Sequence, residues 1–204
     1  GRLGERLMGR LDYTLTPSFL KQWTLAYTFF DNDVNVHQRA DRLYNLSYRQ
    51  HRLELSYSNV WWRDFRYDIG VRFDAFSNPE VLYAMNSDKF AVSNSGKFVN
   101  YFLRAKYSSF DKPHYPAEGI DINLEYTIHT DNFYQRRHHS PFFSLAGSVR
   151  AVLPISRKFA LVPSFHSRAL IGKDVSPFYD NYLGGMVQGQ YYEQQIPFAG
   201  IYNL

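Results

Sequence analysis

Two pairs of carboxylates in this chain are spaced so that each pair could do acid–base chemistry. Asp121 and Glu125 are an even number of residues apart, and so are Asp68 and Asp74. In a β-strand such spacing places both members of a pair on one face, where they could divide the roles of acid and base. Four basic residues occupy similar faces: Arg66, Arg72, Arg104 and Arg150. Cross-strand ion pairing is therefore the better interpretation, because opposite charges stabilise facing strands.

A basic tetrapeptide, Arg136-Arg137-His138-His139, lies in a predicted loop from Thr130 to Pro141. Adjacent side chains point to opposite faces of a strand, and no third ligand of suitable spacing is close, so we predict no metal site. The tetrapeptide could contact the phosphates of lipopolysaccharide, although an exposed basic loop explains it more simply. The nucleophile elbow Gly-x-Ser-x-Gly is absent as well. We predict no catalytic, cofactor or metal site in this chain.

The composition excludes several classes of protein. Aromatic residues make up 18% of the 204 residues, which is too many for a disordered chain. No apolar run approaches the roughly 18 residues of a transmembrane helix. The absence of cysteine excludes a disulfide scaffold and thiolate chemistry. The net charge of +4 comes from scattered basic residues, so no nucleic-acid partner is predicted.

Strict alternation of apolar and polar residues dominates the chain and predicts β-strands. In the clearest segment the apolar residues are Ile120, Ile122, Leu124, Tyr126 and Ile128, and the polar ones are Asp121, Asn123, Glu125, Thr127 and His129. The same pattern recurs at 10–15, 23–29, 52–57, 66–75 and 99–107, and less regularly near 142–153 and 157–172. No helix is predicted. The result is an all-β antiparallel meander of roughly ten to twelve strands, each about 9–12 residues long.

Turn-forming residues separate these segments. The predicted turns are Thr16-Pro17-Ser18, Asp31-Asn32-Asp33, Ser77-Asn78-Pro79, Ser93-Asn94-Ser95-Gly96 and Leu153-Pro154-Ile155-Ser156.

Two architectures fit a sheet with one apolar and one charged face. A soluble barrel or sandwich would bury the apolar face, whereas an outer-membrane-type barrel would turn it to lipid and keep a polar interior. Strand length, the several charges on each polar face and aromatic pairs such as Trp61-Trp62 near strand ends favour the membrane barrel. A soluble glycan- or lipid-binding module and a passive porin-like channel stay as alternatives.

Three segments of the second half resemble a known family. Tyr115-Pro116-Ala117-Glu118-Gly119 is similar to the aromatic-Pro-x-x-Gly element that opens a strand in the bacterial surface-antigen superfamily of outer-membrane barrels. Asn181-Tyr182-Leu183-Gly184-Gly185 resembles the Gly-Gly element of those barrels. Gln194-Gln195-Ile196-Pro197-Phe198-Ala199-Gly200 is similar to a segment in the C-terminal barrel of bacterial patatin-like phospholipases. The order and spacing of the three segments match as well.

The resemblance assigns structural roles to ten residues: Tyr115, Pro116, Gly119, Gly184, Gly185, Gln194, Gln195, Pro197, Phe198 and Gly200. Pro116 would suit the entry to a strand because it cannot donate a ladder hydrogen bond, and the glycines allow backbone that a Cβ would block. Protein-assembly members of the superfamily carry an Arg-Gly-aromatic tip soon after the Gly-Gly element. The stretch from Met186 to Tyr192 lacks that tip, which favours the patatin-like branch.

The resemblance therefore implies a function for the chain. We expect residues 1–204 to form a single β-barrel domain that is a piece of a longer protein in the bacterial outer membrane. The barrel would anchor, and could position or help to export, a patatin-like lipase domain that is not in this chain. Expected partners are outer-membrane lipid, the barrel-assembly machinery, lipopolysaccharide at the basic tetrapeptide and a second copy in a homo-oligomer.

Overall fold

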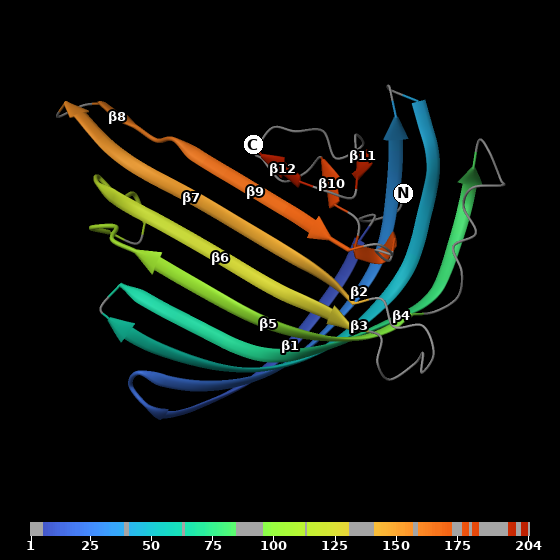
Figure 1. Ribbon diagram of the computed structural model, residues 1–204, viewed down its shortest axis with the longest axis horizontal. Helices are drawn as coiled ribbons and strands as arrows, with labels where there is room; N and C mark the ends of the chain where they lie inside the picture. The colour runs from blue at the N-terminus through green and yellow to red at the C-terminus, as the bar shows by residue number, and fades with distance from the viewer. Residues whose placement is uncertain are drawn as a thin grey trace.

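A long, curved antiparallel sheet makes up most of the molecule (Figure 1). The computed structural model describes residues 6–38, 41–62, 64–84, 96–112, 114–130, 141–156, 159–172, 177–179, 181–183, 196–198 and 201–203. The first six strands are β1 (Arg6–Ser18), β2 (Lys21–Gln38), β3 (Asp41–Trp62), β4 (Phe65–Ala84), β5 (Lys97–Ser108) and β6 (Gly119–Thr130). The remaining strands are β7 (Phe142–Ser156), β8 (Phe159–Leu161), β9 (Ser164–Ile171), β10 (Asn181–Leu183), β11 (Ile196–Phe198) and β12 (Ile201–Asn203).

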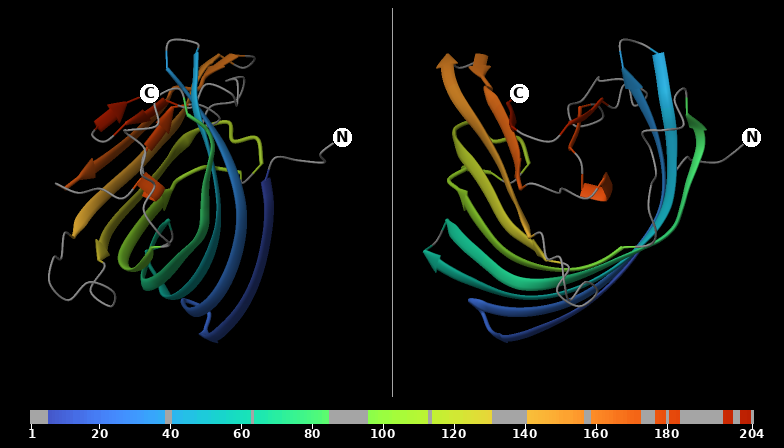
Figure 2. Two further views of the ribbon diagram at one scale, coloured as in Figure 1. Left: turned by 90° about the vertical axis from the view of Figure 1, so that its right-hand side faces the viewer. Right: turned by 45° about the vertical axis from the view of Figure 1, so that its right-hand side comes forward.

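The strands pair in the order β1-β2-β3-β4-β5-β6-β7-β9-β12, so the predicted all-β antiparallel meander is confirmed. β8 pairs with the C-terminal end of β7, and β9 pairs with the preceding part of that strand. β10 and β11 form a separate two-stranded sheet. Among the described strands β1 and β12 are not paired with each other, so the sheet is open; Figure 2 shows it as a deep trough. The one helical element in the described residues is a 3-10 turn, η2 (Pro177–Tyr179). No helix in that part of the chain is long and apolar enough to cross a membrane.

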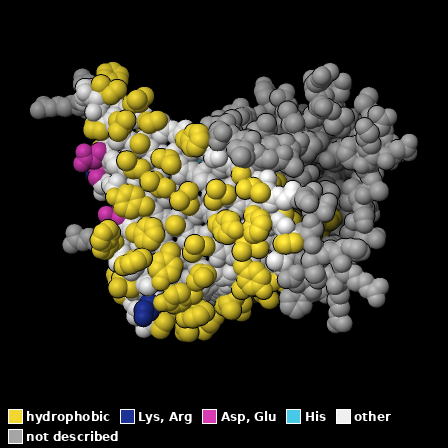
Figure 3. Space-filling view, viewed as in Figure 1, with side chains coloured by type: hydrophobic (Ala, Val, Ile, Leu, Met, Phe, Trp, Pro, Cys, Tyr) yellow, Lys and Arg dark blue, Asp and Glu magenta, His cyan; other side chains and the backbone are white. Residues whose placement is uncertain are grey.

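The two faces of the sheet are inverted relative to a soluble protein. On the outer, convex face Leu124 is 49% exposed, whereas Asp74 and Asn100 on the inner, concave face are fully buried. Hydrophobic side chains cover most of the described part of the face in Figure 3, and charged groups appear only near its edges. The alternation therefore places apolar residues along the outer face and the charged residues inside, together with a few buried aromatic rings such as Phe76 and Phe102. This is the arrangement of a barrel in lipid. This arrangement favours the membrane barrel over a soluble module with an apolar core.

Five strands are longer than the sequence predicts. β1 and β7 exceed the prediction slightly, with 13 and 15 residues. β2, β3 and β4 have 18, 22 and 20 residues, although about 9–11 residues suffice to cross a bilayer. The predicted turn Asp31-Asn32-Asp33 is wrong, because these residues pair with Arg49, Tyr48 and Ser47 inside the β2–β3 ladder. Pairing with a neighbouring strand has overridden local turn propensity here.

Two other predicted turns lie within strands. Ser77-Asn78-Pro79 is part of β4, where Ser77 pairs with Arg49 and Glu80 with Ser47. Asn78 and Pro79 thus lie opposite the single residue Tyr48 in a β-bulge. A bulge accommodates proline, which has no backbone N–H to donate to the ladder. The segment from Leu153 to Ser156 belongs to β7.

The remaining turn predictions have mixed outcomes. The first reversal lies at Phe19 and Leu20, just after Thr16-Pro17-Ser18, which ends β1. Most of Ser93-Asn94-Ser95-Gly96 is outside the described residues.

Gly70 on the inner face of β4 has no room for a side chain. A Cβ built at this residue would collide with the backbone oxygen of Leu55 in β3 and would come within 2.5 Å of Cζ of Phe102 in β5. The Phe102 ring therefore covers the glycine and fills the space that a side chain would occupy.

Replacing Gly70 by alanine should test this packing. We expect Gly70→Ala to lower the free energy of unfolding by about 1–3 kcal/mol, because backbone and ring must both shift. Gly9→Ala is the matched control: nothing lies within 4 Å of its Cβ position, so its effect should stay within about 0.5 kcal/mol. Urea unfolding of the folded protein in lipid vesicles measures both. Equal effects of the two substitutions would contradict the close packing.

Candidate functional site

Four charged side chains from four adjacent strands form one network on the inner face. Arg72 Nε donates to Glu54 Oε2 at 2.9 Å, and Arg72 Nη2 donates to Glu125 Oε1 at 3.3 Å. Arg104 Nη1 donates to Glu54 Oε1 and Arg104 Nε to Glu125 Oε2, both at 2.8 Å. Each arginine thus bridges both carboxylates, and the four formal charges cancel. The predicted cross-strand ion pairing on this face is confirmed for Arg72, Arg104 and Glu125.

Phe102 holds the two arginines of this network in place. The Cζ atom of Arg104 lies 4.2 Å from the centre of the Phe102 ring, and that of Arg72 lies 4.9 Å from it. Stacking of a guanidinium on an aromatic ring adds attraction beyond packing and restricts the orientation of the side chain. The Gly70–Phe102 contact therefore positions the ion pairs as well as the strands.

Asp74 is the centre of a second polar cluster on the same face. Its carboxylate is fully buried and accepts hydrogen bonds from Gln50 Nε2 at 2.9 Å, Arg52 Nε at 2.8 Å and Asn100 Nδ2 at 2.6 Å. Tyr179 of η2 donates a fourth from its hydroxyl at 2.9 Å. A buried carboxylate with these partners is compensated in both charge and hydrogen bonding.

The segment η2 lies against the concave side of the sheet, as the right-hand view of Figure 2 shows. Phe178 stacks on Phe76 of β4, with ring centres 4.4 Å apart and planes 5° from parallel. The Tyr179 hydroxyl donates to Asp74 and accepts from Asn100 Nδ2 at 3.0 Å. One aromatic stack and one shared polar cluster therefore fix this segment to the inner wall.

His129 of β6 extends the Asp74 cluster towards β7. Its Nδ1 lies 2.9 Å from Asn100 Oδ1, and its Nε2 lies 2.9 Å from Ser144 Oγ. The ring stacks on Phe142, with centres 4.5 Å apart. Both ring nitrogens thus have partners, and the described residues contain no group of three His, Asp or Glu side chains able to hold a metal ion.

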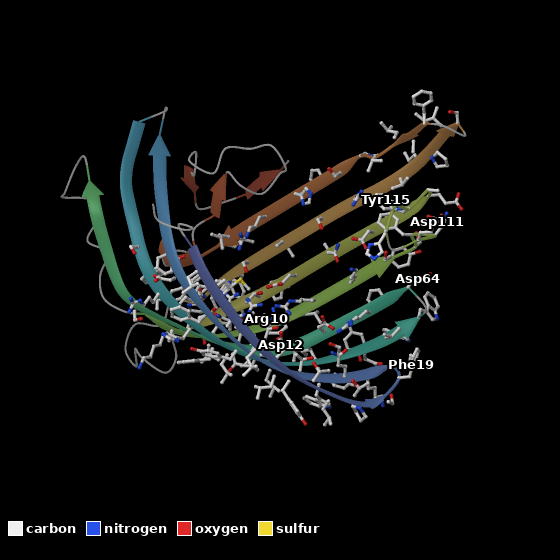
Figure 4. The ribbon with its side chains drawn as sticks, turned by 180° about the vertical axis from the view of Figure 1, so that it is seen from behind. Arg10, Asp12, Phe19, Asp64, Asp111 and Tyr115 are labelled. Atoms are coloured by element: carbon white, nitrogen blue, oxygen red, sulfur yellow. The ribbon has the colours of Figure 1, made fainter. Side chains whose placement is uncertain are left out.

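The first resemblance motif lies in the turn between β5 and β6. Tyr115 has a φ of 78° and Gly119 a φ of 119°, and a Cβ at Gly119 would lie 2.5 Å from the backbone oxygen of Ser109. Glycine is therefore required where β6 begins. Pro116 lies in the turn itself, three residues before the strand. Tyr115 is 94% exposed, and Figure 4 shows it beside Asp111 at the edge formed by the hairpin ends, which Phe19 and Asp64 also mark.

Asp111 organises this turn. Its Oδ1 accepts hydrogen bonds from the backbone amides of Ala117 at 2.8 Å and Glu118 at 3.3 Å. The amide of Ala117 is the main reason why the pKa of the Asp111 carboxyl is lowered from its ordinary value. The carboxylate thereby supports the strained backbone at Tyr115.

Five of the seven residues to which the resemblance assigns roles in the other two motifs lie outside the described part of the chain: Gly184, Gly185, Gln194, Gln195 and Gly200. The basic tetrapeptide Arg136-Arg137-His138-His139 lies outside it as well. Pro197 and Phe198 form part of β11, and they pair with Tyr182 and Asn181 of β10. The strand pairing thus joins the second motif to the third.

Sequence patterns did not single out five residues that donate to Asp74 or bind the arginines: Gln50, Arg52, Glu54, Asn100 and Tyr179. Glu54 contacts Arg104, which lies two strands away in β5, so strand order and register had to be known first. Tyr179 is 105 residues from Asp74 in the sequence. It lies in η2, a segment without the alternation of apolar and polar residues that marks the strands. The available signal for Glu54 and Asn100 was their place on the polar face of alternating segments.

Glu54 should contribute more to stability than an exposed acidic residue on the same face. Its side chain is 12% exposed and bridges two arginines, so Glu54→Gln should cost about 3 kcal/mol of unfolding free energy. Asp12→Asn is the control, because the Arg10–Asp12 pair is 49% and 42% exposed and should contribute less than about 1 kcal/mol. Urea unfolding in vesicles compares the two. A Glu54 variant as stable as the Asp12 variant would contradict the network.

The turn between β5 and β6 should respond to acid. The pKa of Asp111 is lowered in the folded state. Its carboxylate therefore stabilises the turn fully above the ordinary aspartate pKa of about 4, and this stabilisation is lost as the pH falls through the lowered pKa. NMR of the Ala117 amide against pH should show a transition centred below that ordinary value. The transition should vanish in Asp111→Asn, whereas its persistence there would assign it to another group.

Comparison with known proteins agrees with the inverted faces of the sheet. The family model of the OMP85 superfamily matches residues 16–204. No curated protein and no solved structure matches the chain. Proteins of this superfamily are bacterial outer-membrane proteins, and their barrel domains are not catalytic. The predicted surface-antigen resemblance is therefore confirmed at the level of the superfamily: the chain belongs to the OMP85 superfamily of outer-membrane β-barrels.

Proposed function

We propose that this chain is the barrel that anchors a patatin-like lipase domain in the bacterial outer membrane, and that it positions that domain or helps to export it. The observation that carries the anchoring role is the inverted sheet, with apolar side chains outside and ion pairs inside. Transfer of the outer face into lipid is favourable, and the ladder satisfies the backbone of each paired strand.

The sequence between Met186 and Tyr192 supports the patatin-like branch of the superfamily. It lacks the Arg-Gly-aromatic tip of protein-assembly barrels, and the motif from Gln194 to Gly200 resembles the barrel of patatin-like phospholipases. In that branch a Ser–Asp dyad in a separate α/β domain hydrolyses lipid. This chain would therefore supply the anchor and not the chemistry.

A passive porin-like channel is the second candidate. The structure favours it less, because η2 occupies part of the concave side of the sheet, where Tyr179 is bound to Asp74 and Asn100. Conductance of the folded protein in a planar bilayer would detect such a channel.

The other predicted partners follow from this proposal. An outer-membrane barrel is expected to contact lipid along its outer face and to require the barrel-assembly machinery. Lipopolysaccharide binding at Arg136-Arg137-His138-His139 and formation of a homo-oligomer stay predictions, and the tetrapeptide is outside the described residues.

Fractionation of the full-length parent protein tests the proposal. We expect it in the outer-membrane fraction of a density gradient, with a gel mobility that changes on boiling, because a closed barrel resists detergent until it is heated. Purified parent should release fatty acids from phospholipid vesicles, whereas residues 1–204 alone should not.

The outcomes separate the two parts of the proposal. A soluble parent without a mobility shift would overturn the barrel anchor. An outer-membrane, heat-modifiable parent without lipase activity would keep the anchor and overturn the attached lipase.

A further inference from the structure

A hollow of about 450 Å³ lies on the inner face of the sheet, apart from the Asp74 cluster. Small residues of β7, from Ala146 to Ser148, leave the space open. Longer polar side chains from β4, β5, β6 and β9 surround it: Asp68, Arg104, Lys106, Asn123, Glu125, His166 and Arg168. A hollow of this size admits a small organic molecule.

The strand register sets basic groups on both sides of these small residues. Arg104 in β5, Glu125 in β6, Ala146 in β7 and Arg168 in β9 are successive partners in one row. Lys106, Asn123, Ser148 and His166 form the next row. The backbones of β5 and β9 are three strand spacings, or about 14 Å, apart. Lys106 of β5 and Arg168 of β9 can therefore reach a ligand between them from opposite sides.

The acidic residues of the hollow are already neutralised. Asp68 accepts a hydrogen bond from Arg66 Nε at 3.0 Å, and Glu125 is shared by Arg72 and Arg104. In contrast, no carboxylate of the described residues lies within ion-pair distance of Lys106 or Arg168. The Nε atom of Arg168 is buried and has no hydrogen-bond partner among the described residues. The hollow thus has a surplus of positive charge on opposite sides.

We propose that this hollow binds the phosphate group of an organic phosphate. The planar fork of an arginine matches phosphate oxygens, and the lysine ammonium adds a second, compact charge. The volume exceeds what inorganic phosphate alone needs, so the organic part of the ligand has room beside Ala146 and Ser148. The proposal rests on the outer-membrane barrel but not on an attached lipase domain, and its readout, ligand binding, differs from the location and lipase activity that test the proposed function.

The shared chemistry has two sources, a soluble phosphate ester and the headgroup of a phospholipid. Isothermal titration calorimetry would use the full-length protein, purified from outer membranes in a non-ionic detergent. The probes are inorganic phosphate, glycerol 3-phosphate and mixed micelles of that detergent with short-chain phosphatidylglycerol. A mobility shift on boiling verifies that each variant is folded.

Two substitutions test the hollow in different ways, and one serves as control. Arg168→Gln removes a cation, whereas Ala146→Leu fills the space and keeps every charge. Arg150→Gln removes a cation from the inner face of β7 outside the hollow, opposite Asp121 and Ser164. We expect the first two to weaken binding about tenfold or more, as loss of a charge-assisted hydrogen bond or of space would. The control should bind like the unmodified protein.

The probes then identify the source of the phosphate. Saturable binding of glycerol 3-phosphate would support a soluble ester, and saturable binding of the mixed micelles alone would support a lipid headgroup. Either result supports the site only if Arg168→Gln and Ala146→Leu weaken it. No saturable binding of any probe, or equal weakening by Arg150→Gln, would overturn the proposal.

Discussion

The structure depends on one constraint: the two faces of a single sheet must meet different surroundings. Because successive side chains of a strand point to opposite faces, each residue is committed to lipid or to the interior by its position alone. In β5, Tyr101 and Leu103 are accordingly exposed on the outer face, while Asn100 and Phe102, which alternate with them, are buried on the inner face. A shift of one residue in register would exchange these environments, so the inner contacts act together to hold the register.

The inner ion pairs hold the strands in register. Glu54 in β3 reaches Arg104 in β5 across β4, and such a contact is possible only if both intervening ladders are in register. Gly70 contributes by lacking a side chain, since the Phe102 ring occupies its place and supports both arginines. Buried charge of this kind adds little net stability but strongly disfavours misaligned states, in which it would be left unpaired.

The sequence predicted those features that repeat along a strand. The alternation from Ile120 to Ile128 correctly gave the strand, its two faces and the kind of interaction on the polar one. Features that depend on other strands could not be predicted in this way. Asp31 to Asp33 have turn-forming side chains, yet the β2–β3 ladder continues through them. The hydrogen bond from Tyr179 to Asp74 joins a strand to a segment with no alternating pattern, so the local sequence does not predict it.

The inner wall divides into two regions by charge. In the Asp74 cluster the buried carboxylate has four donors, one of them from η2, so this region is saturated and serves to hold the chain in place. Around Ala146 the acidic groups are likewise paired, but Lys106 and Arg168 have no carboxylate among the described residues. The half-buried Arg168, whose Nε atom has no hydrogen-bond partner among the described residues, carries the cost of partial desolvation. A ligand that supplies the missing negative charge gives that arrangement a physical reason.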